Sequence, residues 1–85
     1  MIESMEQSVL LPESLGKALR AARKKKKMTQ TQVGKIVGIE QHTVSKLEAG
    51  RIGVSLGTLF RVLSALELEL VVRPRQKVVS GGDEW

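Results

Sequence analysis

The sequence predicts a mainly α fold of four to five short helices that is followed by one short β-strand. Three observations support this fold class. Between residues 12 and 65, apolar residues recur at spacings of three and four, which is the period of an amphipathic helix. Glycines or a run of lysines close the periodic segments, as expected at helix ends. After residue 65 the period changes to two, which is typical of a strand with one buried face.

The length of 85 residues leaves room for one domain. A chain this short has little core, so we expect it to gain stability as a homodimer. Aromatic residues make up only 2% of the sequence, so the core should be aliphatic, with Phe60 as its one aromatic member. We divide the chain into a flexible arm at 1–11, a helical domain at 12–73 and a flexible tail at 74–85.

The first helix is expected to begin at Pro12, because proline suits a first helical turn. It runs to about Lys26, and its cationic end at Lys24–Lys27 suits the negative end of the helix dipole. This basic run either contacts phosphate or is an ordinary solvated helix end. The predicted apolar face consists of Leu15, Ala18, Leu19 and Ala22.

The second and third helices should meet at a glycine corner. Thr29 and Gln32 have the spacing of a capping box, which begins a helix. Gly38 supplies a left-handed stop, and the next helix runs from about Glu40 to Ala49. Gly34 lies one turn before the corner, where a side chain would hold the two helices apart. The apolar positions of the second helix are Val33, Ile36 and Val37.

Ser55 can cap a fourth helix, with an apolar face at Leu56, Leu59, Phe60 and Leu63. The strand is predicted over residues 66–72. No second strand is evident upstream, so this strand should pair with the same strand of a second copy. The residues assigned to dimerisation are Leu66, Leu68, Leu70 and Val72.

Composition excludes several classes of function. The net charge of +5 and the pI near 10 favour a polyanionic partner, nucleic acid before a membrane surface. The chain has no cysteine and one histidine, and it lacks paired carboxylates and a phosphate-binding glycine loop, so we expect no enzyme, metal, cofactor or small-molecule ligand. Scarce aromatics argue against a reader of single-stranded RNA. We expect a cytoplasmic protein, because neither a signal peptide nor a membrane span is recognisable.

The segment from Gln30 to Ala49 predicts the function. Two short helices joined at Gly38 must meet at a steep angle. Five apolar residues would then point inward: Val33, Val37, Ile39, Val44 and Leu47. The opposite face of the third helix carries Gln41, His42, Ser45 and Lys46. Glutamine can bond bidentately to adenine and lysine can donate to guanine, so this face suits the DNA major groove; the alternative is an ordinary solvated helix face.

Residues 30–48, together with Arg23, resemble the helix-turn-helix of the phage 434/lambda repressor class. From about Pro12 to the C-terminus, the chain also resembles the HipB-type antitoxins of type II toxin–antitoxin modules. The residues that carry this second likeness lie at 39–45 and 58–68, together with the Glu84-Trp85 ending.

The resemblance implies a role for each matching position. Gln41, His42, Ser45 and Lys46 would contact bases. Gln30 would contact phosphate and brace the recognition helix, with further phosphate contacts from Thr29, Thr43, Arg51 and Lys27. Arg23 and Glu48 would form a largely buried ion pair. Glu40 stands where relatives often carry a neutral or basic residue near a phosphate, so either a contact there is lost or Glu40 simply caps the helix.

The implied biology is a dimer that binds a palindromic operator in double-stranded DNA and represses its own operon. Its second partner would be a HipA-like serine/threonine kinase toxin, with Trp85 docking into a pocket on that toxin. Two alternatives stay open. One is a stand-alone phage-type repressor without a toxin, and the other is a protein-interaction module that has lost DNA binding.

Overall fold

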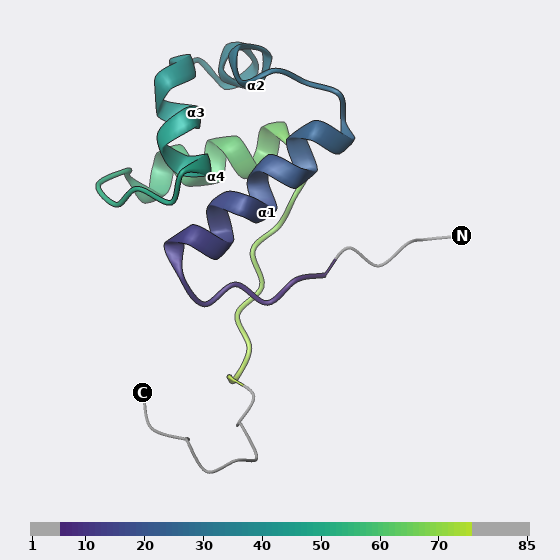
Figure 1. Ribbon diagram of the computed structural model, residues 1–85, viewed down its shortest axis with the longest axis vertical. Coiled ribbons are helices and arrows are strands. Elements are labelled where there is room, and N and C mark those ends of the chain that lie inside the picture. The colour runs from purple at the N-terminus through teal and green to yellow at the C-terminus, as the bar shows by residue number, and fades with distance from the viewer. Residues whose placement is uncertain (1–5, 76–85) are drawn as a thin grey trace.

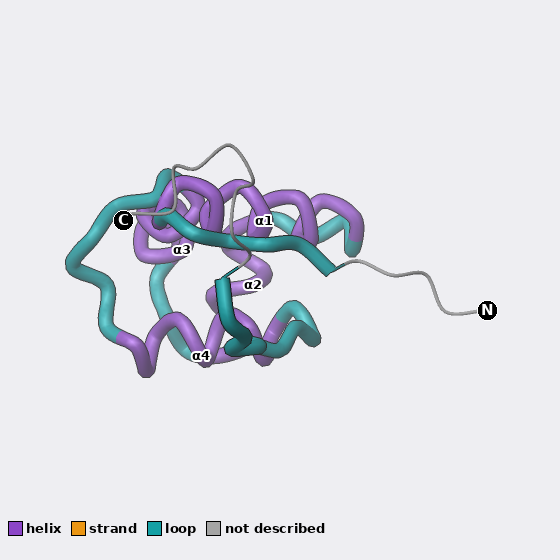
Figure 2. The backbone as a smooth tube through the Cα atoms, turned by 90° about the horizontal axis from the view of Figure 1, so that it is seen from below, coloured by secondary structure: helices purple, strands orange, loops and turns teal. Residues whose placement is uncertain are grey.

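The computed structural model describes residues 6–75 and folds them into four helices (Figure 1). Their bounds are α1 Pro12–Lys25, α2 Gln30–Val37, α3 Gln41–Glu48 and α4 Leu56–Ala65. The remaining described residues are loops and turns, without a strand among them (Figure 2). The mainly α fold class is therefore confirmed, with four helices.

Local chemistry sets where the helices begin. Pro12 occupies the first turn of α1. At the start of α2, the Thr29 hydroxyl accepts from the Gln32 N–H at 3.0 Å and the Gln32 side chain accepts from the Thr29 N–H at 2.8 Å. Ser55 caps α4 by accepting from the Thr58 N–H at 3.1 Å. Each arrangement supplies partners for backbone N–H groups that a helix start leaves unpaired, as predicted.

The predicted corner between α2 and α3 is present. Gly38 has a φ of 74°, in the left-handed region that an L-residue with a side chain rarely adopts. A Cβ on Gly34 would collide with the carbonyl oxygen of Ile39. These two glycines therefore let the chain turn sharply from α2 into α3.

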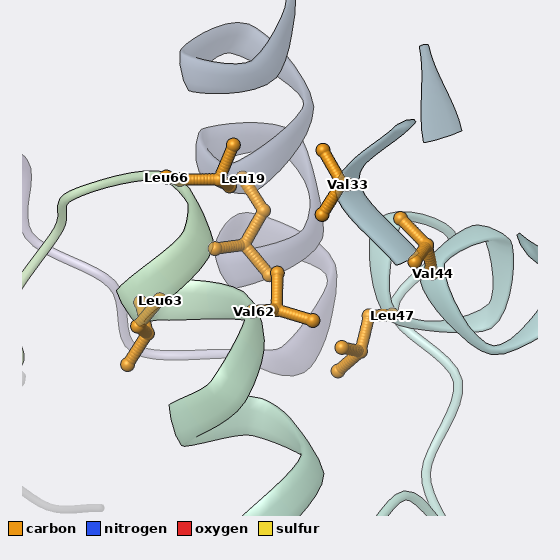
Figure 3. Packing of buried hydrophobic residues seen from close by; sticks show 7 residues of the cluster. All are labelled: Leu19, Val33, Val44, Leu47, Val62, Leu63 and Leu66. Carbon is orange, nitrogen blue, oxygen red and sulfur yellow. The ribbon is translucent and has the colours of Figure 1, made fainter. Parts of the chain in front are cut away.

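The core is aliphatic, as predicted, and draws on all four helices (Figure 3). Its buried members are Leu19, Val33, Val44, Leu47, Val62, Leu63 and Leu66. The placement of Phe60 in this core was wrong, because half of its surface is exposed. Ile36 and Leu56 also face outward, although their spacing matched the apolar faces of α2 and α4. Val37 and Ile39 are half-buried.

A glycine sets how closely α1 approaches the end of α3. A Cβ on Gly16 would lie 2.6 Å from the carbonyl oxygen of Leu47 and 2.8 Å from the carbonyl carbon of Glu48. Both neighbours are backbone atoms, which cannot move aside as a flexible side chain would. Only glycine fits this crossing.

The expected strand at 66–72 is not formed in the described chain. Glu67 has a φ of 58°, and the Leu68 N–H donates to the Leu63 carbonyl at 2.8 Å, so this backbone closes α4. Leu66 is 2% exposed and belongs to the core, which corrects its assignment to dimerisation. Residues 68–75 continue without regular structure.

The first and last described segments contact each other. Arg73 donates to the Ser8 hydroxyl at 2.6 Å and lies 3.5 Å from a carboxylate oxygen of Glu6. Within 6–75, the chain has no helix with the length and apolar composition needed to cross a bilayer.

Candidate nucleic-acid interface

The outer face of α3 carries the predicted base-contacting residues. Gln41, His42 and Lys46 are exposed and Ser45 is half-buried, whereas Val44 and Leu47 are buried on the opposite face. The two faces of this eight-residue helix are therefore separated as expected: one locks α3 into the core and the other presents polar groups to the outside.

Arg23 of α1 and Glu48 of α3 form the ion pair that the family resemblance implied. Their two contacts are Nε to Oε2 at 2.6 Å and Nη2 to Oε1 at 3.1 Å. The side chains are 10% and 5% exposed. Arg23 also donates from Nη1 to the Met28 carbonyl at 2.8 Å. This bidentate, charge-assisted arrangement fixes the end of α3 against α1.

The surroundings of Glu48 favour its charged form. Burial raises the pKa of the Glu48 carboxyl, but hydrogen bonds from Arg23 and Gln30 and the positive charges of Arg23 and Arg20 outweigh it, so the pKa lies below its usual value. The hydrogen bond to Glu48 raises the pKa of Arg23 in turn. The pair is therefore ionised near neutral pH.

Gln30 extends the ion pair outward to the exposed face of α3. Its Nε2 donates to Glu48 Oε1 at 3.0 Å, and its Oε1 accepts from Gln41 Nε2 at 2.5 Å. Gln30 begins α2, and Gln41 begins α3. A chain of side-chain hydrogen bonds therefore runs from the buried Arg23 to the exposed Gln41.

Glu40 occupies the N-cap position of α3, but its side chain makes no capping hydrogen bond. Its Oε1 lies 3.2 Å from Nδ1 of His42 instead. Glu40 is therefore the N-cap residue, as one of the two alternatives held, but it lacks the side-chain hydrogen bond of a typical cap.

The residues assigned to phosphate contacts lie mainly at turns and helix ends. Lys27 follows α1 with a φ of 58°, and Arg51 follows α3 with its N–H bonded to the Lys46 carbonyl. Both are exposed, as is Thr29, whereas Thr43 is half-buried. The Thr29 hydroxyl oxygen accepts from Gln32 and still has its hydrogen to donate. Trp85, assigned to toxin binding, lies outside the described residues.

Two details of this region were not foreseen. The resemblance implied that Gln30 braces the third helix, but not that Gln41 is its partner, because the two residues are eleven positions apart and no local pattern encodes their bond. The crossing at Gly16 had one signal in the sequence, since a glycine inside a helical pattern costs about 1 kcal/mol of helix stability and usually has a packing reason.

Among residues 6–75, no three His, Cys, Asp or Glu side chains are grouped to hold a metal ion.

A model of the helix-turn-helix family matches residues 19–72, well over half of the sequence. The chain belongs to the helix-turn-helix family. This family consists of DNA-binding regulators and not of enzymes, and α2 and α3 are the two helices that meet at the Gly38 corner.

Two relatives within curated proteins extend this finding. The HTH-type transcriptional regulator y4dL of Sinorhizobium fredii is 38% identical over 64 residues, which are 75% of this chain and 33% of that regulator. The antitoxin HipB of Escherichia coli strain CFT073 is 33% identical over 66 residues, 78% of this chain and 70% of the antitoxin. This helix-turn-helix chain thus spans a third of the first relative and most of the second.

Solved structures show the same likeness. The match to the HipB-O4 20mer complex has a TM-score of 0.79 and 30% sequence identity, and it covers 84% of this chain and 100% of that chain. A chain of the HipA-HipB-O2-O3 complex matches with a TM-score of 0.78 and 30% identity over the same shares. The predicted similarity to HipB-type antitoxins is therefore confirmed.

Proposed function

We propose that this protein is a dimeric antitoxin and autorepressor that binds a palindromic operator and a HipA-like kinase toxin. The observation that carries the DNA-binding part is the polar outer face of α3, held in place by the chain of bonds from Arg23 to Gln41. A recognition helix needs such a rigid support, because a side chain that reads a nucleobase must be oriented before it enters the groove.

In this proposal, Gln41, His42, Ser45 and Lys46 read base edges in the major groove. Phosphate contacts come from the ends of the helices and position the protein without selecting sequence. The residues proposed for these phosphate contacts are Gln30, Thr29, Thr43, Arg51 and Lys27. Gln30 has both roles, since it also holds Gln41 and the end of α3.

Dimerisation is assigned to the surface formed by α4 and the segment after it. Phe60 and Leu70 are exposed, and Leu68 is half-buried. A shallow pocket joins the two elements and is lined by Phe60, Leu63, Ser64, Leu68, Glu69 and Leu70. Because residues 68–73 form no ladder with any part of residues 6–75, we propose that their backbone pairs with the same segment of a second copy. A two-fold dimer would place its two recognition helices about 34–36 Å apart, one turn of DNA.

The toxin partner rests on similarity. A solved relative with the same fold is a complex whose name includes HipA as well as HipB. We propose a HipA-like serine/threonine kinase as the partner of this chain, with Trp85 as the anchor that docks on it.

DNA selection tests the operator part. Purified protein is mixed with randomised duplex DNA, and the enriched sequence is measured against single-base variants. Lys46→Ala should lose about 1–3 kcal/mol of discrimination at one base pair. Arg61→Ala is the charge-matched control, because Arg61 is exposed on α4. Equal losses for Lys46→Ala on every sequence would contradict base reading.

Affinity purification from the native host tests the toxin part. A co-eluting kinase that is lost with Trp85→Ala supports the proposed antitoxin. Recovery of operator DNA without any kinase would instead indicate a stand-alone repressor.

A further inference from the structure

We infer that Glu48 is a positioning residue that sets which groups of Gln41 face the operator, although Glu48 itself is shielded from the DNA. This inference rests on the proposed function, and it concerns base preference within that function. The Glu48 side chain is only 5% exposed, so any effect on the DNA must pass through its neighbours.

The hydrogen bonds around Glu48 have a fixed direction. An ionised carboxylate only accepts hydrogen bonds, and the guanidinium of Arg23 only donates them. Both oxygens of Glu48 accept from Arg23, and Oε1 also accepts from Gln30 Nε2 at 3.0 Å. Turning the Gln30 amide over would place its oxygen against the carboxylate, and two acceptors form no hydrogen bond. The nitrogen of the Gln30 amide therefore has to face Glu48.

The same direction passes through Gln30 to Gln41. Because Glu48 holds the nitrogen of Gln30, the oxygen Oε1 is the group left to face Gln41, and it accepts from Gln41 Nε2 at 2.5 Å. Gln41 must therefore present its own nitrogen to Gln30. Within residues 6–75 this direction leaves no buried side-chain nitrogen or oxygen without a partner.

The groups that remain on Gln41 follow from its hydrogen-bonding capacity. A side-chain amide has two N–H donors and one acceptor oxygen. Gln30 uses one donor, so the exposed Gln41 keeps one donor and its oxygen. In the major groove, adenine offers one acceptor beside one donor, whereas guanine offers two acceptors. The direction set by Glu48 thus favours adenine where Gln41 meets the DNA, and the reversed direction, which leaves two donors on Gln41, favours guanine.

The test separates hydrogen-bond direction from stability. The operator enriched by the full-length wild type is changed one base pair at a time, and the ratio of affinities between operators is measured for each protein. Partial unfolding of a variant lowers its affinity for every sequence by the same factor, so it leaves this ratio unchanged. Gln41→Ala identifies the base pair that Gln41 reads.

Glu48→Gln replaces a group that only accepts with an amide that can also donate. Its nitrogen can donate to Gln30 and reverse the direction, so the preference for adenine over guanine at this base pair should fall by about fivefold or more. The double variant Glu48→Gln/Gln41→Ala should show no loss of preference beyond that of Gln41→Ala.

Two substitutions of Gln30 form a matched pair. Gln30→Glu keeps a group that accepts from Gln41, so the preference should stay within about twofold of the wild type, even though a second carboxylate beside Glu48 lowers stability. Gln30→Lys supplies a group that only donates, and it should remove the preference as Glu48→Gln does. Thermal unfolding measures the stability of each variant.

Three results would overturn the inference. The first is a wild-type preference at this base pair in Glu48→Gln. The second is an equal loss in Gln30→Glu and Gln30→Lys, which would make the contact with Gln41, and not its direction, the determinant. The third is a Gln41→Ala protein with unchanged affinity ratios at every base pair. A wild type that enriches no sequence at all would overturn the proposed function together with this inference, whereas normal enrichment with any of the three results would overturn the inference alone.

Discussion

Gln41 at the start of α3 donates its side-chain N–H to the side-chain oxygen of Gln30 at the start of α2, at 2.5 Å. Gln30 is itself bonded to Glu48 at the other end of α3. One side chain of α2 therefore contacts both ends of the recognition helix. This relationship makes Gln30 a structural support for the proposed base-reading face as well as a candidate phosphate contact.

Replacing Gln30 with Ala should weaken the discrimination between base pairs that we propose for Gln41. The Gln41 amide loses its partner and must be ordered during DNA binding, and the loss of the bond to Glu48 should cost about 1 kcal/mol in the free energy of unfolding. Binding to single-base operator variants and urea unfolding measure the two effects. Unchanged discrimination at the position read by Gln41 would show that the bond does not orient it.

Stability should fall in acid because of Glu48. The pKa of this carboxyl is lowered in the folded chain, so the unfolded chain binds the proton more readily. The stabilisation is therefore complete above the ordinary glutamate pKa of about 4.3 and is lost as pH falls from there through the folded pKa. Urea unfolding from pH 7 to pH 2.5 measures the loss.

Glu48→Gln supplies the comparison for this titration. At pH 7 this substitution should lower the free energy of unfolding by about 3 kcal/mol, because it leaves Arg23 without its charged partner in a buried site. The difference in stability from the wild type should shrink below pH 4. Glu67→Gln is the control. The hydrogen bond from Lys26 lowers the pKa of Glu67 as well, but this pair is at the surface, so its removal should have little effect. A constant difference between wild type and Glu48→Gln at all pH values would contradict the assignment.

Gly16→Ala should destabilise the fold by about 1–3 kcal/mol, because the added Cβ overlaps backbone atoms at the end of α3. Gly57→Ala is a matched control in α4, where the nearest neighbouring atom would be 3.9 Å away. There the same change should stabilise the chain by about 0.5–1 kcal/mol. Thermal unfolding of both variants tests the close approach of α1 to the end of α3. Equal changes in stability for the two substitutions would contradict it.

Phe60→Ser should weaken dimerisation while leaving the monomer folded, because Phe60 is half-exposed beside the pocket shared with Leu70. Leu66→Ala should instead unfold the chain more easily, by about 2–5 kcal/mol, since Leu66 is buried in the core. Analytical ultracentrifugation over a range of protein concentrations measures self-association, which Phe60→Ser should weaken directly. A Phe60→Ser protein with wild-type association would place the dimer surface elsewhere.

The parts of the fold that could be predicted are those that local sequence encodes. Capping pairs such as Thr29 and Gln32, and the glycine at position 38, act within one or two turns, so the pattern sufficed. The ion pair of Arg23 with Glu48 came from family resemblance, because it joins residues 25 positions apart.

The errors arose where one pattern allows two structures. Leu66 continues the helical spacing of Leu59 and Leu63, and it also begins the alternation with Leu68. Helical packing prevailed: Leu66 is the C-cap residue that follows α4, and the left-handed Glu67 comes directly after it. Phe60 fits an apolar face as well, but spacing does not say whether that face meets the chain's own core or remains at the surface.

The separation of faces on α3 has a practical use. Val44 and Leu47 anchor the helix through one side, while His42 and Lys46 project from the other without any tie to the core. The projecting residues can therefore be exchanged as a small cassette on an unchanged scaffold. Libraries randomised at these two positions, with Gln30 and Gln41 retained, offer a route to variants redirected to new DNA targets.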